Sequence, residues 1–196
     1  MTAQSTQRIV YFDLDVKFWA GRPPSVGGAR PACCPRCGAQ GVATDGTTLV
    51  GHGLRERTVL GPWGFGAPPE EVTFRARRYR CTRCRAVLCV VPRGILRGMA
   101  YGALAIGLAL ALWLSLPSWQ IRSRVSPRRG SDSERLHGWR AVSRWARDGT
   151  RWWPWLRFGA QSGHRRTEQL VQQLAARSAL PAGEVARLAC DGALRA

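Results

Sequence analysis

The sequence predicts an α+β fold, in which a small antiparallel sheet comes first and a mainly α-helical domain follows. Two pairs of cysteines with the spacing Cys-x-x-Cys flank segments of alternating hydrophobicity, which is typical of strands. Further along the chain, apolar residues recur at helical spacing. The 196 residues suit one ordinary domain or two to three small modules, and a hydrophobic content of 45% supports packed structure. We predict four segments: an N-terminal strand and linker (1–30), the sheet domain (31–94), the helical domain (95–150), and a Trp-rich linker with C-terminal helices (151–196).

The N-terminal stretch VYFDLDVKF places Asp13 and Asp15 directly after an apolar run. It resembles the hydrophobic-DxDx(T/V) motif of haloacid-dehalogenase-type phosphatases, in which the first carboxylate is the nucleophile. That chemistry needs a doubly wound sheet, and Pro23 and Pro24 soon end the pattern. An isolated short motif is weak evidence. We therefore expect a short leading strand followed by two solvated acids.

The paired cysteines have the spacing of metal ligands. Cys34 and Cys37 lie in CPRCG, where proline stiffens the turn and glycine permits a positive φ angle. Cys81 and Cys84 lie in CTRCR, which keeps the spacing but lacks both proline and glycine, so we expect the weaker turn there. Each turn supplies two thiolates, and two turns complete the tetrahedral coordination of Zn²⁺. The sequence therefore predicts a zinc ribbon with one structural Zn²⁺ ion bound by all four.

Other uses of the cysteines stay open. A thioredoxin-like redox centre would need one cysteine pair within an alternating β/α pattern, and that pattern is absent. The remaining alternative is a decayed ribbon whose cysteines bind no metal. The beginning of the chain, MTAQSTQRIV, shows no signal sequence, so we expect a cytoplasmic protein without disulfides. Cys34 is preferred over Cys33 because only Cys34 lies two residues before Cys37. Cys89 and Cys190 are expected to be small apolar fillers.

Two strands are expected between the cysteine pairs. The segment 53–60 alternates loosely, and the Pro/Gly-rich stretch GPWGFGAPPE after it is typical of a hairpin loop. In the segment 71–81, apolar and polar residues alternate more clearly. One face would carry Val72, Phe74 and Ala76, and the other Thr73, Arg75, Arg77 and Tyr79.

The stretch 99–116 contains eighteen residues without a charge. A membrane span takes about 20 apolar residues, so length alone nearly qualifies it. Against this, it is mostly Ala, Gly and Leu, it includes Tyr101 and Ser115, and Pro117 follows at once. We predict a buried first helix of the helical domain. A membrane-anchored zinc-ribbon protein with a single span at 99–116 is the alternative.

The stretch SDSERLHGWRAVSRWARDG predicts an amphipathic helix. Ser131 and Glu134 fit a capping box, and Asp148 and Gly149 supply a stop signal. At 100° per residue, one flank would face a core with Trp139, Val142 and Ala146. The other flank would carry Arg140, Arg144 and Arg147, and Arg151 would continue that line.

The charge balance points to a polyanionic partner. Thirty basic residues against twelve acidic ones give a net charge of +18. Lys17 is the only lysine, so part of the arginine content is attributable to the mutational bias of a GC-rich genome. We expect duplex DNA as the partner, bound mainly through arginine–phosphate contacts. The candidate nucleic-acid-binding residues are Arg75, Arg77, Arg78, Arg80, Arg140, Arg144, Arg147 and Arg151.

The order of these features resembles the N-terminal regions of insertion-sequence transposases. The similar elements are CPxCG, an arginine-rich strand ending in RYRCxxC, an apolar helix and SRWARDG, over about residues 31–149. The resemblance implies a zinc ribbon followed by a helix-turn-helix that binds transposon-end DNA, and hence a nucleoid-associated protein. This sequence departs from the family because its second cysteine pair lacks glycine, SWQIRSRVSPRRG is irregular, and no catalytic domain follows. The resemblance therefore implies a stand-alone or degraded DNA-binding module.

We expect no enzymatic activity. The twelve acids are scattered, and none of His52, His137 and His164 has an evident nucleophile partner. In the C-terminal segment, the tryptophans of RWWPWLRF are expected to fasten a linker onto a neighbouring core, with stacking on bases as the alternative. Two amphipathic helices beyond it would complete the helical domain or mediate self-association or binding of a partner protein.

Overall fold

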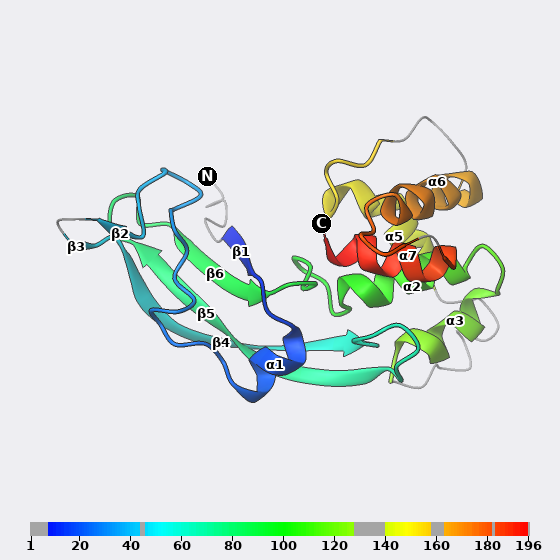
Figure 1. Cartoon of the computed structure of the whole chain (residues 1–196), viewed down its shortest axis with the longest axis horizontal. Coiled ribbons are helices and arrows are strands. Elements are labelled where there is room, and N and C mark those ends of the chain that lie inside the picture. The colour runs from blue at the N-terminus through cyan, green and yellow to red at the C-terminus, as the bar shows by residue number, and fades with distance from the viewer. Residues whose placement is uncertain (1–7, 44–45, 128–139, 158–162, 182, 196) are drawn as a thin grey trace. The chain divides into compact units, whose positions relative to one another are not determined.

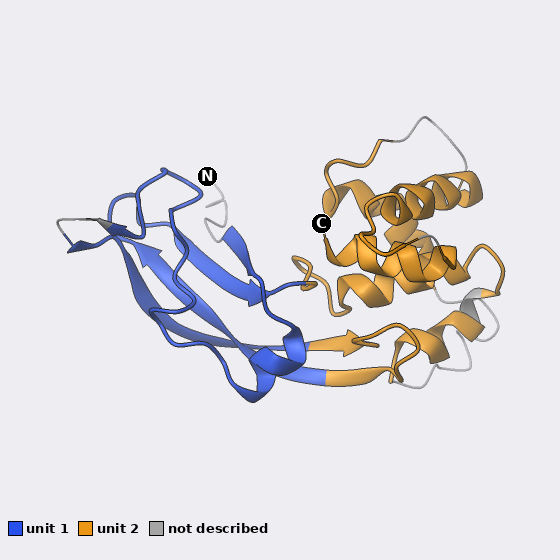
Figure 2. Ribbon diagram, viewed as in Figure 1, with its two compact units in different colours: residues 1–58, 72–93 blue, residues 59–71, 94–196 orange. Residues whose placement is uncertain are grey.

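A computed structural model describes residues 8–43, 46–127, 140–157, 163–181 and 183–195 (Figure 1). The fold is α+β, as predicted, with four strands in one sheet and most of the helices after them. The chain divides into two compact units (Figure 2). Unit 1 comprises Met1–Thr58 and Val72–Arg93, and unit 2 comprises Val59–Glu71 and Gly94–Ala196. The finer division into four segments stays a prediction.

The main sheet has the strand order β1-β6-β5-β4. Its strands are β1 (Arg8–Phe12), β4 (Leu49–Gly61), β5 (Glu70–Cys81) and β6 (Val87–Pro92). Strand β6 pairs antiparallel with β5 and parallel with β1, a pairing that the hydrophobic pattern did not predict. Two short strands, β2 (Val42–Ala43) and β3 (Gly46–Thr47), form a separate antiparallel pair.

The two acids of the leading strand have structural positions. Asp15 caps helix α1 (Val16–Gly21), where its Oδ1 accepts a hydrogen bond of 2.7 Å from the backbone N–H of Lys17. Asp13 forms an ion pair with Arg93. Both acids are exposed, as expected, and the mainly antiparallel sheet is not the doubly wound sheet of the phosphatases.

Strand β5 has buried side chains on both of its faces. Phe74 and Ala76 are buried on the face that the alternation predicted. Tyr79 is also buried, although it lies on the opposite face, and its hydroxyl donates a 2.7 Å hydrogen bond to the carbonyl of Val26. The indole of Trp19 also donates a hydrogen bond to the backbone carbonyl of Arg75 at 3.0 Å. The segment that follows α1 therefore covers the face of the sheet that carries Tyr79.

Unit 2 is helical around one central helix. Its elements are α2 (Ala103–Leu112), α3 (Ser118–Val125), α5 (Arg140–Asp148), the 3₁₀ turn η1 (Gly149–Arg151), α6 (Gly163–Ala175) and α7 (Val185–Leu194). Helix α2 packs against α3, α5, α6 and α7, and residues 103–110 are all buried. The prediction of a buried core helix is thus confirmed. Across the described ranges, no helix has the length and apolar character needed to span a membrane.

The helix expected before Gly149 is present in its second half. Helix α5 ends at Asp148, and Val142 and Ala146 are buried, as predicted, together with Trp145. The predicted capping box of Ser131 and Glu134, and the core position of Trp139, lie outside the described residues.

The C-terminal segment completes the helical core. Trp153 is fully buried, and Trp152 and Trp155 pack against the same core, so the tryptophan-rich linker is fastened to it as expected. Helices α6 and α7 pack against each other and against α2. The α6–α7 contact is close, because a Cβ atom on Gly192 would lie 1.7 Å from the carbonyl oxygen of Leu174.

Candidate metal centre

The first cysteine turn is closed by two backbone hydrogen bonds. The N–H of Gly38 donates to the carbonyl of Cys34 at 2.8 Å, and the N–H of Cys34 donates to the carbonyl of Ala39 at 2.8 Å. Gly38 has a φ angle of 73°, in the left-handed region that glycine adopts without steric cost. The Cys-Pro-Arg-Cys-Gly sequence therefore forms the turn that its composition predicts.

The second turn repeats the first one bond for bond. The N–H of Arg85 donates to the carbonyl of Cys81 at 2.9 Å, and the N–H of Cys81 donates to the carbonyl of Ala86 at 2.9 Å. Arg85 takes the place of Gly38 and has a φ angle of 58°, the single positive value among the described non-glycine residues. The lack of glycine thus leaves the turn geometry intact, but Arg85 must adopt a left-handed backbone conformation that is sterically unfavourable for a residue with a Cβ atom.

Backbone contacts hold the two turns beside each other. The N–H of Thr82 donates to the carbonyl of Thr48 at 2.9 Å, which ties the second turn to the start of β4. The N–H of Gly41 donates to the carbonyl of Ala32 at 2.7 Å, and the carbonyl of Gly41 accepts from Thr48 at 3.1 Å. A Cβ atom on Gly41 would lie 2.2 Å from the carbonyl oxygen of Pro31, so only glycine permits this crossing.

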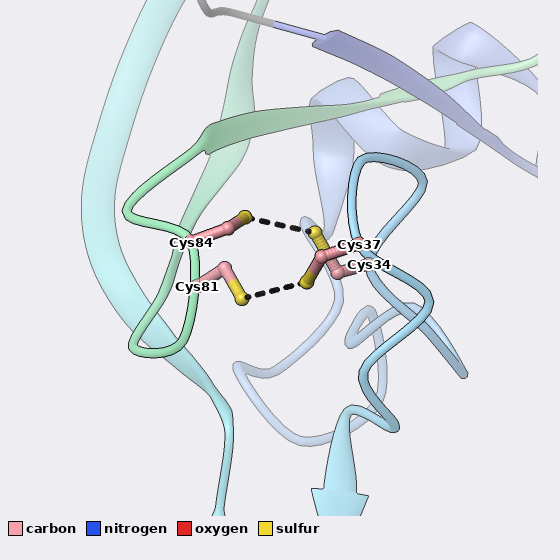
Figure 3. A group of neighbouring side chains, drawn as sticks. All are labelled: Cys34, Cys37, Cys81 and Cys84. Carbon is pink, nitrogen blue, oxygen red and sulfur yellow. Dashed lines mark hydrogen bonds between the residues drawn. The ribbon is translucent and has the colours of Figure 1, made fainter.

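The four thiols converge as the sequence predicts (Figure 3). The Sγ atoms of Cys34 and Cys84 are 3.7 Å apart, those of Cys37 and Cys81 are 3.8 Å apart, and all four lie within 4.8 Å of one another. Four sulfur atoms at about 2.3 Å from a tetrahedral zinc ion would be separated by about 3.8 Å. The cluster has the donor set and the dimensions to hold a metal ion.

The cluster gives its thiols unequal acidity. Burial acts to raise the pKa of Cys34, but hydrogen bonds from the backbone of Arg36 and Cys37 and from neighbouring thiols outweigh it and lower the pKa to about 7. Burial raises the pKa of Cys84 to about 11, and hydrogen bonds with the other three thiols act in the same direction. A metal ion binds thiolates, so it would release protons from the cluster as it binds.

The remaining cysteines stand apart from the cluster. Cys33 is exposed and forms an isolated β-bridge with Gln40, so the choice of Cys34 by its spacing agrees with the geometry. Cys89 is buried in β6. Cys190 is buried in α7, where burial raises its pKa to about 12. His52 is exposed on β4 and is not one of the clustered donors.

The predicted arginines of β5 have different environments. Arg75 and Arg80 are exposed, whereas Arg77 and Arg78 are half-buried. The Nε of Arg77 donates a 2.7 Å hydrogen bond to the carbonyl of Pro24, which fastens the covering segment to the sheet. Arg77 therefore has a structural contact that sequence alternation alone did not reveal.

The predicted arginines of unit 2 all face solvent. Arg140, Arg144, Arg147 and Arg151 are exposed, and the opposite flank of α5 is buried. Arg147 also contacts Asp148, with 3.1 Å between Nε and Oδ1.

Comparisons with known proteins give no relative: no family model, no curated protein and no solved structure matches the chain. A function must therefore be inferred from the cysteine cluster and the charged surfaces themselves.

Proposed function

We propose that the chain is a DNA-binding protein related to transposase targeting regions, in which a structural zinc ion orders a ribbon that precedes a helical DNA-binding domain in the chain. The observation that carries the proposal is the convergence of Cys34, Cys37, Cys81 and Cys84 within 4.8 Å. Four thiolates complete the coordination of Zn²⁺ and leave no open position for a reacting group, which favours a structural role over a catalytic one.

The ion would join segments that are distant in sequence. Cys34 and Cys37 precede the long strands, and Cys81 and Cys84 connect β5 to β6. Four residues in and next to the first turn, Ala32, Cys33, Pro35 and Arg36, are exposed and bury little surface. Metal coordination would add stability to this exposed loop, because binding free energy in a small metal site is also folding free energy.

Helix α5 is the element that we assign to DNA contact. Arg140, Arg144 and Arg147 fall within an arc of about 60° on its exposed flank. Its other flank is fastened to the core by Val142 and Trp145. A helix held in this way presents a fixed row of guanidinium groups, which suits contacts to phosphates. The finer proposal, a helix-turn-helix with α5 as the second helix, follows from the family resemblance.

The metal part of the proposal is tested by zinc stoichiometry. The purified protein should bind about one zinc per chain, and both Cys34→Ser and Cys81→Ser should abolish it, whereas Cys33→Ser, one residue outside the cluster, should not. Absence of zinc from the wild-type protein, or its retention in both cluster variants, would overturn the metal site.

The DNA part is tested by measuring affinity for a mixed-sequence duplex against salt concentration. Each lost phosphate contact should lower the slope of log affinity against log salt by about 0.9. The double variant R144Q/R151Q should therefore lose up to about 1.8 units of slope. Arg187→Gln is the matched control, because Arg187 is an exposed arginine of α7 in the same unit. Salt-independent affinity, or no affinity for duplex DNA, would refute this part.

A further inference from the structure

The pairing of β4 with β5 sorts the arginines of unit 1 onto two faces. The hydroxyls of Thr58 and Thr73 share a 2.8 Å hydrogen bond, which places both side chains on the same face of neighbouring strands. Since side chains alternate along a strand, Arg75 and Arg77 lie on that face as well. Arg78 and Arg80, and on β4 Arg55 and Arg57, lie on the opposite face, which on β5 also carries the buried Phe74 and Ala76.

The titratable groups that act electrostatically on Arg57 agree with this assignment. In the β5–β6 register Arg78 is opposite Cys89, so these two side chains share a face. In the β1–β6 register Ile9 is opposite Cys89 and Tyr11 is opposite Val91, which places Tyr11 on that face too. Burial lowers the pKa of Arg57, and the charges that also act on it are those of Cys89, Arg55 and Tyr11.

We call this surface the arginine face and define it by Arg55, Arg57, Arg78 and Arg80. The Cα atoms of two arginines that are two residues apart on one strand are separated by about 6.7 Å, and neighbouring strands are about 4.8 Å apart. Arg55 and Arg80 are exposed, and Arg57 and Arg78 are half-buried. The strands β4 and β5 carry three acids: alternation places Glu56 and Glu71 on the other face with Thr58 and Thr73, and it places Glu70, at the start of β5, on the arginine face.

We propose that the arginine face binds the phosphate backbone of duplex DNA, as a second contact surface besides helix α5. This inference rests on the proposed DNA-binding function. It adds Arg55 and Arg57 to the residues that contact DNA, although the sequence pattern did not single them out. It removes Arg75 and Arg77 from that set. Guanidinium groups recognise phosphate oxygens through paired hydrogen bonds. Phosphate contacts position a protein without reading bases, so the arginine face should act equally on all sequences.

The test uses full-length zinc-loaded protein and two arginine-to-glutamine variants. R55Q/R80Q changes the exposed members of the arginine face. Arg75→Gln is the matched control, because it is an exposed arginine of the same strand on the opposite face. The backbone carbonyl through which Arg75 holds Trp19 is retained in that variant. Zinc content and thermal denaturation show that each variant is folded.

We expect R55Q/R80Q to lower the slope of log affinity against log salt by about 1.8, and by the same amount on duplexes of unrelated sequence. Arg75→Gln should leave the slope unchanged. Equal losses in both proteins would show a diffuse effect of net charge and overturn the arginine face, as would an unchanged slope in R55Q/R80Q. In either case the R144Q/R151Q result still decides the contribution of α5. Wild-type protein without affinity for DNA would overturn both proposals.

Discussion

Replacement of Arg85 by glycine should stabilise the second cysteine turn. Arg85 has a φ angle of 58°, and the left-handed conformation costs a residue with a Cβ atom about 1–2 kcal/mol. Glycine avoids that cost but loses more conformational freedom on folding, by about 0.5–1 kcal/mol. The net stabilisation of Arg85→Gly is therefore about 0.5–1 kcal/mol. The structure supplies the precedent, since Gly38 occupies the equivalent position of the first turn with a φ angle of 73°.

The matched control is Arg83→Gly in the same turn. It removes the same charge and adds the same glycine, but Arg83 lacks a positive φ angle. It should therefore destabilise the turn by about 0.5–1 kcal/mol, so the two variants should differ by about 1–2 kcal/mol. The assay is urea denaturation of zinc-loaded protein, with release of zinc followed by a chromophoric chelator. Equal shifts of the midpoint in the two variants would refute the assignment of strain to Arg85.

Two further predictions concern unit 2. Gly192→Ala should lower the free energy of unfolding, measured by thermal denaturation, by about 3 kcal/mol or more, because its Cβ would lie 1.7 Å from the carbonyl oxygen of Leu174. The control Gly163→Ala should not destabilise the protein, because the space around its Cβ is open. Asp191→Ala should cost about 1–3 kcal/mol, since Asp191 accepts hydrogen bonds from Ser178, Ala179 and Arg195. The hydrogen bond from Arg195 holds the pKa of Asp191 below its ordinary value of 3.8, so this stabilisation is present above about pH 4 and is lost as the pH falls through the lowered pKa. Acid unfolding that is equally steep with and without Asp191 would contradict this linkage.

The cysteine cluster was predictable because its information is local. A Cys-x-x-Cys spacing specifies a tight turn whatever surrounds it, and two such turns need only one another to complete a donor set. The expected weakness of the second turn was a different kind of inference, drawn from the missing glycine. The structure shows that Arg85 adopts the conformation that Gly38 adopts, because two hydrogen bonds close the turn, one from Arg85 to the carbonyl of Cys81 and one from Cys81 to the carbonyl of Ala86.

The buried helix α2 was predictable for a similar reason. A run without charges has no polar flank, so it must be surrounded on all sides, either by protein or by lipid. The pattern left the choice between these two open. The surrounding helices α3, α5, α6 and α7 decide it within the described chain, since they leave residues 103–110 buried. Their packing depends on side chains far away in sequence, such as Trp145 and Trp153.

The surface role of each arginine was not predictable, because strand pairing decides it. Alternation within β5 correctly separated Arg75 and Arg77 from Phe74 and Ala76. It could not show that the segment from Pro24 to Val26 would cover the face of Arg77, nor that β4 would add Arg55 to the other face. A chain with a net charge of +18 binds polyanions in general. A defined interface requires cations on one accessible face, so variants on opposite faces of one strand separate the two cases more sharply than any change in total charge.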